Sequence, residues 1–70
     1  MNIATTPTFE PGERVLLTRT VHLAGQRLAG PGTVTEVAAT HPQRVRVSLD
    51  DHLGQQLWVE ATDLRRAPTV

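Results

Sequence analysis

The stretch Arg44-Val45-Arg46-Val47-Ser48-Leu49 alternates strictly between polar and aliphatic side chains. Successive side chains of a β-strand point to opposite faces, so this pattern predicts a strand whose aliphatic residues face a core and whose polar residues face outward. The segments on both sides continue the β pattern. The sequence therefore predicts an all-β domain built around this strand.

The segment on the C-terminal side repeats the alternation. Residues 50–54 combine acidic and small side chains and predict a turn, and residues 55–60 predict the next strand. On that strand the inward residues are Leu57 and Val59, and the outward residues are Gln56, Trp58 and Glu60. Residues 61–64 predict a single 3₁₀ turn that leads into a short last strand at 65–67.

The segment on the N-terminal side, residues 33–39, predicts a strand with an irregularity. Val34 and Val37 stand three positions apart, so strict alternation would put them on opposite faces. A β-bulge near Thr35 or Glu36 would return both valines to the interior. A flat strand is the alternative.

The first third of the domain predicts one strand and one irregular segment. Residues 14–21 are mostly branched or β-preferring and follow a turn at Pro11-Gly12, which predicts the first strand. Residues 22–31 contain two glycines and a proline. These breakers argue against a helix and predict a long loop or a ragged hairpin.

The 70 residues of the chain make one small domain. We expect the folded unit at residues 9–67 and tails at 1–8 and 68–70. A domain of this length hides only about 60% of its unfolded surface, and without cysteine no disulfide or thiolate metal site supplements the core. The expected core is aliphatic and consists of Val15, Leu17, Val34, Val37, Val45, Val47, Leu49, Leu57, Val59 and Leu64.

Seven arginines balance seven acidic residues, and lysine is missing. A net charge of zero is a poor electrostatic footprint for nucleic acid, because counterion release needs several unneutralised cations. No apolar run approaches a membrane span and the first residues lack the features of a signal peptide, so we expect a cytoplasmic protein. His22, His41 and His52 lack a close ligand spacing, and we expect no metal site and no cofactor.

Three short motifs resemble those of small bacterial SH3-like and KOW-like domains. They are Gly12-Glu13-Arg14-Val15, Gly32-Thr33-Val34 and Asp63-Leu64, which match an opening Gly-x-x-Val, a Gly-Thr-Val strand start and a late acidic-Leu pair. The resemblance covers nearly all of residues 9–67 and implies a five-stranded SH3-like barrel with one 3₁₀ turn before the last strand. The motifs are architectural, since their glycines permit backbone turns and their valines fill a core.

A narrower resemblance is to the plasmid-borne type II dihydrofolate reductases. It rests on Phe9-Glu10-Pro11-Gly12-Glu13-Arg14-Val15. In that family four copies line one central pore with Gln-Ile-Tyr from a late strand, and the nearest match here is Gln56-Leu57-Trp58. The family's lysine after the opening valine is missing, and the spacing from the glutamine to the closing leucine differs by one residue. The resemblance implies kinship of architecture and, as one alternative function, a homo-oligomeric reductase-like pore.

Trp58 has the most to offer a partner, because an exposed indole combines a large apolar area with one hydrogen-bond donor. The strand register turns it outward beside Arg44 or Arg46, whose guanidinium groups would stack on it. The inward orientation stays open, because a one-residue register shift exchanges the two faces. Our leading hypothesis is a non-enzymatic module that binds a protein partner or its own copy through Trp58, Arg44, Arg46 and Gln56.

A second hypothesis is a KOW-type nucleic-acid surface on adjoining strands. Its basic residues would be Arg44, Arg46, Arg65 and Arg66. The acidic residues close enough in sequence to neutralise them are Glu13, Glu60 and Asp63, which favours paired surface ions. The sequence contains no Ser-His-Asp spacing, P-loop or Rossmann fingerprint, so the reductase-like pore is the enzymatic alternative.

Overall fold

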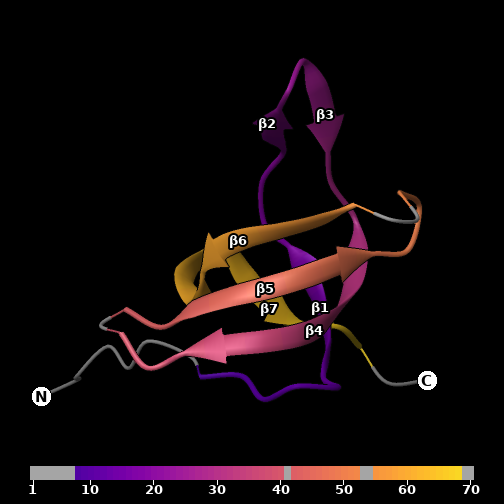
Figure 1. Ribbon diagram of the computed structural model, residues 1–70. Helices are drawn as coiled ribbons and strands as arrows, with labels where there is room; N and C mark the ends of the chain where they lie inside the picture. The colour runs from indigo at the N-terminus through magenta and orange to yellow at the C-terminus, as the bar shows by residue number, and fades with distance from the viewer. Residues whose placement is uncertain (1–7, 41, 53–54, 69–70) are drawn as a thin grey trace, which may run out of the picture.

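The computed structural model describes residues 8–40, 42–52 and 55–68, which fold into β-strands and one 3₁₀ turn (Figure 1). In chain order the elements are β1 (Arg14–Leu17), β2 (Val21–Leu23), β3 (Gln26–Leu28), β4 (Pro31–Ala38), β5 (Arg44–Leu49), β6 (Gln56–Glu60), η1 (Ala61–Asp63) and β7 (Leu64–Arg66). All ladders between these strands are antiparallel. The predictions of an all-β domain and of a 3₁₀ turn before the last strand are confirmed, although the described residues form seven strands instead of five.

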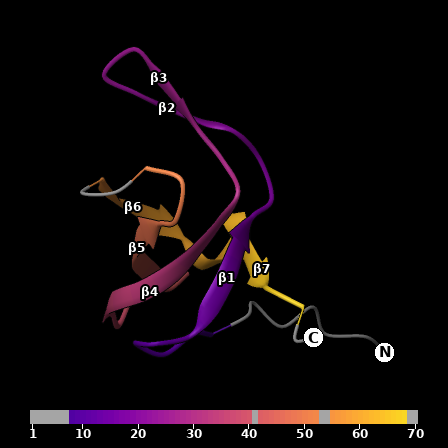
Figure 2. The ribbon, with the colours of Figure 1, turned by 90° about the vertical axis from the view of Figure 1, so that its right-hand side faces the viewer.

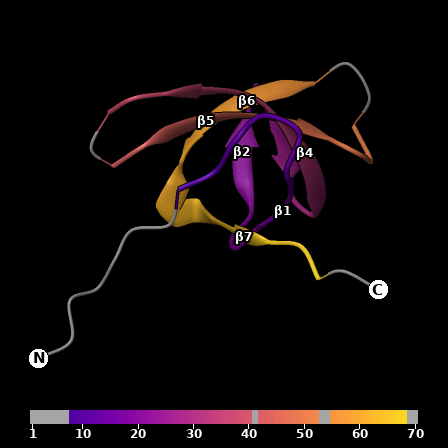
Figure 3. The ribbon, with the colours of Figure 1, turned by 90° about the horizontal axis from the view of Figure 1, so that it is seen from below.

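Five of the strands form one sheet in the order β6-β5-β4-β1-β7, and β2 and β3 form a separate hairpin. The larger sheet is strongly curved, so that β5 and β6 lie on one side of the domain and β7 lies on the other (Figures 2 and 3). Within the described residues no ladder joins β6 to β7, because η1 carries the chain from one edge of the sheet to the other without pairing them. The expected closed barrel is therefore corrected to an open, curved sheet.

The bulge that the valine spacing predicts is present in β4. The register of β4 on β5 shifts between Val34 and Glu36, which leaves Thr35 without a cross-strand partner. Val34 is buried in the core, and Val37 packs against the core from the same face of the strand. The extra residue thus keeps both valines inside and adds to the bend of the strand.

Eight of the ten predicted core residues are buried, and the other two, Leu17 and Val37, pack partly buried against them. Three residues that the prediction left out complete the core: Phe9, Leu28 and Ala61. Ala61 continues the inward spacing of Leu57 and Val59 by one step, into the segment that was predicted to be a 3₁₀ turn. Phe9 and Leu28 lie outside the alternating stretches, and their burial follows from tertiary contacts, which a periodicity argument does not see.

The segment between β1 and β4 forms the ragged hairpin that was one of the two expectations. The predicted first strand over residues 14–21 is too long, because β7 begins at Leu64 opposite Leu17 and β1 loses that partner beyond Leu17. β2 and β3 project from the sheet (Figure 1) and join at Ala24 and Gly25, whose φ values are 51° and 79°. Positive φ at both central residues is the geometry of a type I′ turn.

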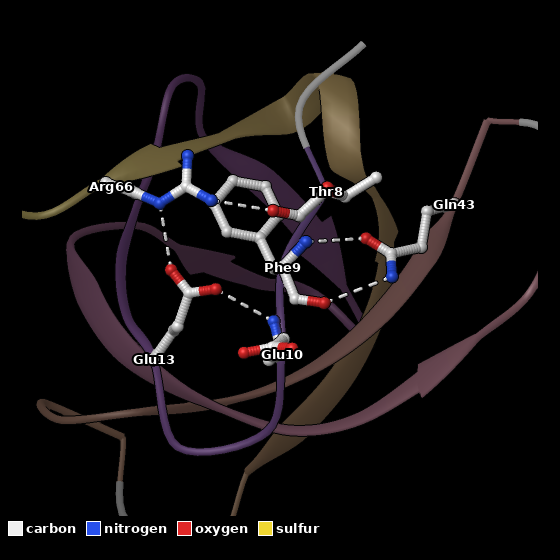
Figure 4. Close-up of polar contacts among 6 residues, drawn as sticks. All are labelled: Thr8, Phe9, Glu10, Glu13, Gln43 and Arg66. Atoms are coloured by element: carbon white, nitrogen blue, oxygen red, sulfur yellow. Dashed lines mark hydrogen bonds and ion pairs between the residues drawn. The ribbon is translucent and has the colours of Figure 1, made fainter.

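Phe9 closes one end of the core and is held by side chains that are distant in sequence (Figure 4). Its N–H donates to Oε1 of Gln43 at 2.8 Å, and Nε2 of Gln43 donates to its carbonyl at 3.1 Å. The guanidinium carbon of Arg66 lies 5.1 Å from the centre of the phenyl ring. Arg66 also donates to the carbonyl of Thr8 at 2.8 Å and to the carboxylate of Glu13 at 2.9 Å. The segment before β1 is thereby fixed across the end of the sheet.

Candidate interaction surface on the edge strand β6

Trp58 points away from the core. The residue is 43% exposed, whereas Leu57 and Val59 on either side of it are each 6% exposed. Of the two orientations that the sequence leaves open, the outward one is confirmed. A large amphipathic side chain in this position has the character of an interface anchor.

Three cross-strand rows of side chains make up the outer face of β4, β5 and β6, called the outer face below. Read from β4 to β6, the rows are Thr33–Ser48–Gln56, Glu36–Arg46–Trp58 and Ala38–Arg44–Glu60. The structure thus brings together on one face all four residues of the predicted protein-binding surface. Trp58 and Gln56 lie on β6, and the two arginines lie on β5.

Arg46 is engaged by an acidic residue and not by the indole. Its Nη1 donates to Oε1 of Glu36 at 3.0 Å, on the side of the row away from Trp58. Among the described residues the cation–π pair is Arg66 over Phe9. The expected stacking of an arginine on the indole is therefore replaced by an ion pair, and much of the Trp58 side chain is left to solvent.

The bulge residue Thr35 ties the strands of the outer face together. Its hydroxyl donates to the carbonyl of Arg46 at 3.2 Å and lies 3.5 Å from Oε1 of Gln56. One side chain on β4 therefore reaches both β5 and β6. The sequence predicts the bulge but not this contact, because the contact depends on how the three strands align.

One hydrogen bond at the C-terminal end of β6 shows which residues of the strand direct their backbone groups toward β5. Arg44 lies opposite Glu60 in the ladder with β5, which places Gln43 opposite Ala61. The N–H of Ala61 donates to the carbonyl of Gln43 at 2.7 Å, so this pair is a hydrogen-bonded one. Hydrogen-bonded and non-hydrogen-bonded pairs alternate along an antiparallel ladder. This one bond therefore fixes the direction of every backbone group on the strand.

It follows that β6 has an open main-chain edge. Leu57 and Val59 bond to β5, whereas Gln56, Trp58 and Glu60 direct their N–H and C=O groups away from it. Within the part of the chain that the structure describes, β6 has no second strand beside it. The residues that present side chains on the outer face are thus the same ones that present backbone groups at the edge.

The arginines of the predicted nucleic-acid patch are divided between two strands. Arg44 and Arg46 lie on β5, Arg65 and Arg66 lie on β7, and β4 and β1 stand between these strands in the sheet. The prediction that the patch occupies adjoining strands is wrong, because strand order is not visible in the sequence. Glu13 neutralises Arg66 as expected, with Nε and Oε2 2.9 Å apart, whereas Asp63 pairs with Arg19.

Two exposed ion pairs change the pKa of both of their arginines and of one carboxylate. Arg14 on β1 donates to Oδ1 of Asp50 at 2.8 Å, makes a second bond to Oδ2, and also reaches Thr33. The hydrogen bonds between Arg14 and Asp50 lower the pKa of Asp50 and raise the pKa of Arg14. The hydrogen bond from Arg19 to Asp63 likewise raises the pKa of Arg19. Both pairs link β1 or the segment after it to distant turns, which is a structural role.

His22 and His52 lie outside the three strands that form the outer face. His22 is exposed on β2 in the hairpin, His52 lies half-buried in the turn after β5, and His41 is outside the described residues. No cluster of three or more His, Cys, Asp or Glu suited to a metal ion occurs in the described ranges. The groups that the outer face offers a partner are an indole, guanidinium groups, carboxylates, hydroxyls, an amide and one main-chain edge.

An open hollow of about 510 Å³ lies over β1 and β7. Its lining residues are Glu13, Arg14, Leu16, Pro31, Arg66, Ala67 and Pro68. The sequence gives no signal for it, because its walls come from segments that only the fold makes neighbours. None of the residues of the predicted protein-binding surface contributes to it.

No relative assigns a role to the surface on β6. The described residues contain no helix that is long and apolar enough to cross a membrane. Comparison with known proteins found no matching family model, no similar curated protein and no similar solved structure.

Proposed function

We propose that this chain is a non-enzymatic binding module that recognises a protein partner through the outer face and the open edge of β6. Trp58 is the apolar anchor, and Gln56, Arg44 and Arg46 supply polar contacts beside it. The partner contributes an extended segment that pairs with the edge. In this mode of recognition main-chain hydrogen bonds provide affinity and alternate side chains provide specificity.

The observation that carries the proposal is the meeting of an exposed indole and an unpaired strand edge at one residue. Trp58 is 43% exposed, and its N–H and C=O point away from β5. An added strand would satisfy these backbone groups and remove part of the indole from water in the same step. Apolar burial then drives the association, and the edge gives it direction.

We also infer that the architecture is SH3-like, in an open form. The strand order β7-β1-β4-β5-β6, the hairpin between β1 and β4 and the 3₁₀ turn before β7 support this inference. The motifs that begin at Gly12 and Gly32 support it as well. A fold of this type hosts many functions, so the proposal for function rests on the outer face alone.

The distribution of charge favours a protein over a nucleic acid as the partner. Arg46 on β5 is neutralised by Glu36, and Arg66 on β7 is neutralised by Glu13. Binding to phosphates gains its free energy from cations that replace condensed counterions, and a neutralised guanidinium contributes little to that exchange. The net charge of the whole chain is zero, which fits the same conclusion.

Site-specific photo-crosslinking in the producing cell tests the proposal. Benzoylphenylalanine in place of Gln56 samples the open edge, and the same amino acid in place of Arg65 samples β7 at the opposite edge of the sheet. We expect a discrete protein adduct from position 56 that disappears when Trp58→Ser is added, and no such adduct from position 65. Equal labelling from the two positions, or an adduct that persists with Trp58→Ser, would contradict the proposal.

A further inference from the structure

We infer that the partner is a second copy of this chain, which pairs its own β6 antiparallel to this one about Trp58. The inference rests on the proposed function and names the occupant of the open edge. Three features support it: the difference between the two edges of the sheet, the pairing that β6 can make with a second β6, and the exposure of core residues along β6.

The two edge strands of the sheet differ in how readily they can pair with a further strand. β7 has three residues, two of them arginines, and Pro68 follows soon after it. Short length, charge and a nearby proline are the features with which proteins block strand addition. β6 has five residues, no proline and one charged residue, Glu60. The described sheet is thus protected at one edge and open to pairing at the other.

The sequence of β6 is complementary to itself when two copies run antiparallel with Trp58 at the centre. Gln56 then lies opposite the partner's Glu60, and Trp58 lies opposite the partner's Trp58. The Gln56 amide is a donor and the partner's Glu60 carboxylate is an acceptor, and two-fold symmetry makes this pair twice. The register contains no like-charge pair across the new ladder.

The main-chain edge selects the same register. Gln56, Trp58 and Glu60 all direct backbone groups away from β5, and the C=O of Glu60, the N-cap of η1, already accepts the first bond of that turn. Pairing centred on Trp58 therefore engages all three residues and creates about four main-chain hydrogen bonds. A shift of the partner by two residues in either direction leaves one of the three residues without a pair. The centred register is therefore the one that gives all three residues a partner across the new ladder.

The core residues on β6 are also more exposed to solvent than those on β5. Leu57 and Val59 are each 6% exposed, whereas Val45 and Val47, their neighbours on β5, are 0% exposed. In the centred register Leu57 lies opposite the partner's Val59 on the inner face. A second copy would therefore extend the apolar layer across the junction and cover this residual exposure.

Sedimentation equilibrium of the full chain, measured over a range of concentrations, tests the inference with two variants of one exposed residue. Wild type is expected to approach twice the 7.7 kDa monomer mass as concentration rises. Gln56→Glu places two carboxylates opposite each other at both ends of the pairing and should weaken the dimer about tenfold. Gln56→Arg places a cation there and should strengthen it by a similar factor.

A double variant serves as the control for the register. Gln56→Glu combined with Glu60→Gln restores a glutamine opposite a glutamate and should return the dimer dissociation constant to within about threefold of wild type. Circular dichroism checks that each variant keeps the native spectrum. Position 56 is exposed, so a change in mass with an unchanged spectrum reports on association.

The outcomes separate this inference from the function on which it rests. A wild-type chain that stays at monomer mass at millimolar concentration overturns self-pairing, yet an adduct to a different protein from position 56 would still support a binding module. A dimer that responds equally to Gln56→Glu and Gln56→Arg overturns the centred register. Loss of every adduct at position 56 counts against the module itself.

Discussion

Gly32 on β4 is the position where a single added methyl group should harm the fold most. The residue is buried and pairs with Val15 on β1 and Leu49 on β5. An added Cβ would lie 2.7 Å from the carbonyl oxygen of Ser48, 2.7 Å from Cγ1 of Val47 and 3.2 Å from Cδ2 of Leu49. The two side chains have limited freedom to move, but the Ser48 carbonyl belongs to the β5 backbone. Relief of the clash therefore requires β4 and β5 to move apart.

The expected size of the effect follows from this geometry. Overpacking of a dense core costs about 1–3 kcal/mol, and a clash with main chain places Gly32→Ala near the upper limit. A domain of this length has an unfolding free energy of roughly 4–10 kcal/mol, and its Tm falls about 4–8 °C for each kcal/mol lost. We therefore expect the Tm of Gly32→Ala to fall by about 10 °C or more.

Thermal unfolding followed by far-ultraviolet circular dichroism measures the effect, with Gly12→Ala as the matched control. Gly12 has φ of 94° and no atom within 4 Å of an added Cβ, so its substitution carries backbone strain of roughly 1 kcal/mol and no clash. The packing explanation requires Gly32→Ala to lower Tm clearly more than the control. Equal shifts, or a smaller shift for Gly32→Ala, would refute it.

Three further substitutions test other contacts. Gln43→Ala leaves both backbone groups of Phe9 without their side-chain partner and should lower the unfolding free energy by about 1–3 kcal/mol in a urea titration. Ala24→Asn should raise it by about 1 kcal/mol, because asparagine tolerates the positive φ of the β2–β3 turn better than alanine; a lower Tm would contradict this. The folded pKa of Asp50 lies below its ordinary value of 3.8, so its ion pair stabilises the protein above that pH and is lost as pH falls through the folded pKa. The stability difference between wild type and Asp50→Asn should therefore narrow on acidification, and a constant difference from about pH 6 to about pH 2 would count against the pairing.

Alternation along single segments predicted a large part of the sheet, because it is a local signal. The strand at 44–49 is β5 with the same limits, and Leu57 and Val59 face inward as expected. The spacing of Val34 and Val37 predicted the bulge for the same reason, since both faces of a strand can be read from its own residues.

Features that depend on contacts between distant segments were not predictable in this way. Phe9 is buried because Gln43, 34 positions away, binds its backbone. Leu28 is buried because a hairpin returns it to the sheet, although the breakers around it predict an irregular segment. The motif glycines divide similarly: Gly12 serves a turn as expected, whereas Gly32 lies within β4 and makes room for close packing.

The site on β6 shows why a sequence with the correct strands can leave its binding surface undecided. The side chains of a strand alternate between two faces, and its backbone groups alternate between two edges, both with a period of two residues. The face on which a residue presents its side chain and the edge to which it directs its backbone groups are therefore set together. One tertiary hydrogen bond, from the N–H of Ala61 to the carbonyl of Gln43, determines both for the whole of β6. A register one residue out of step would bury Trp58 and also turn its backbone toward β5. The exposed indole and the open edge thus have a single structural cause, so a partner that uses one of them necessarily meets the other.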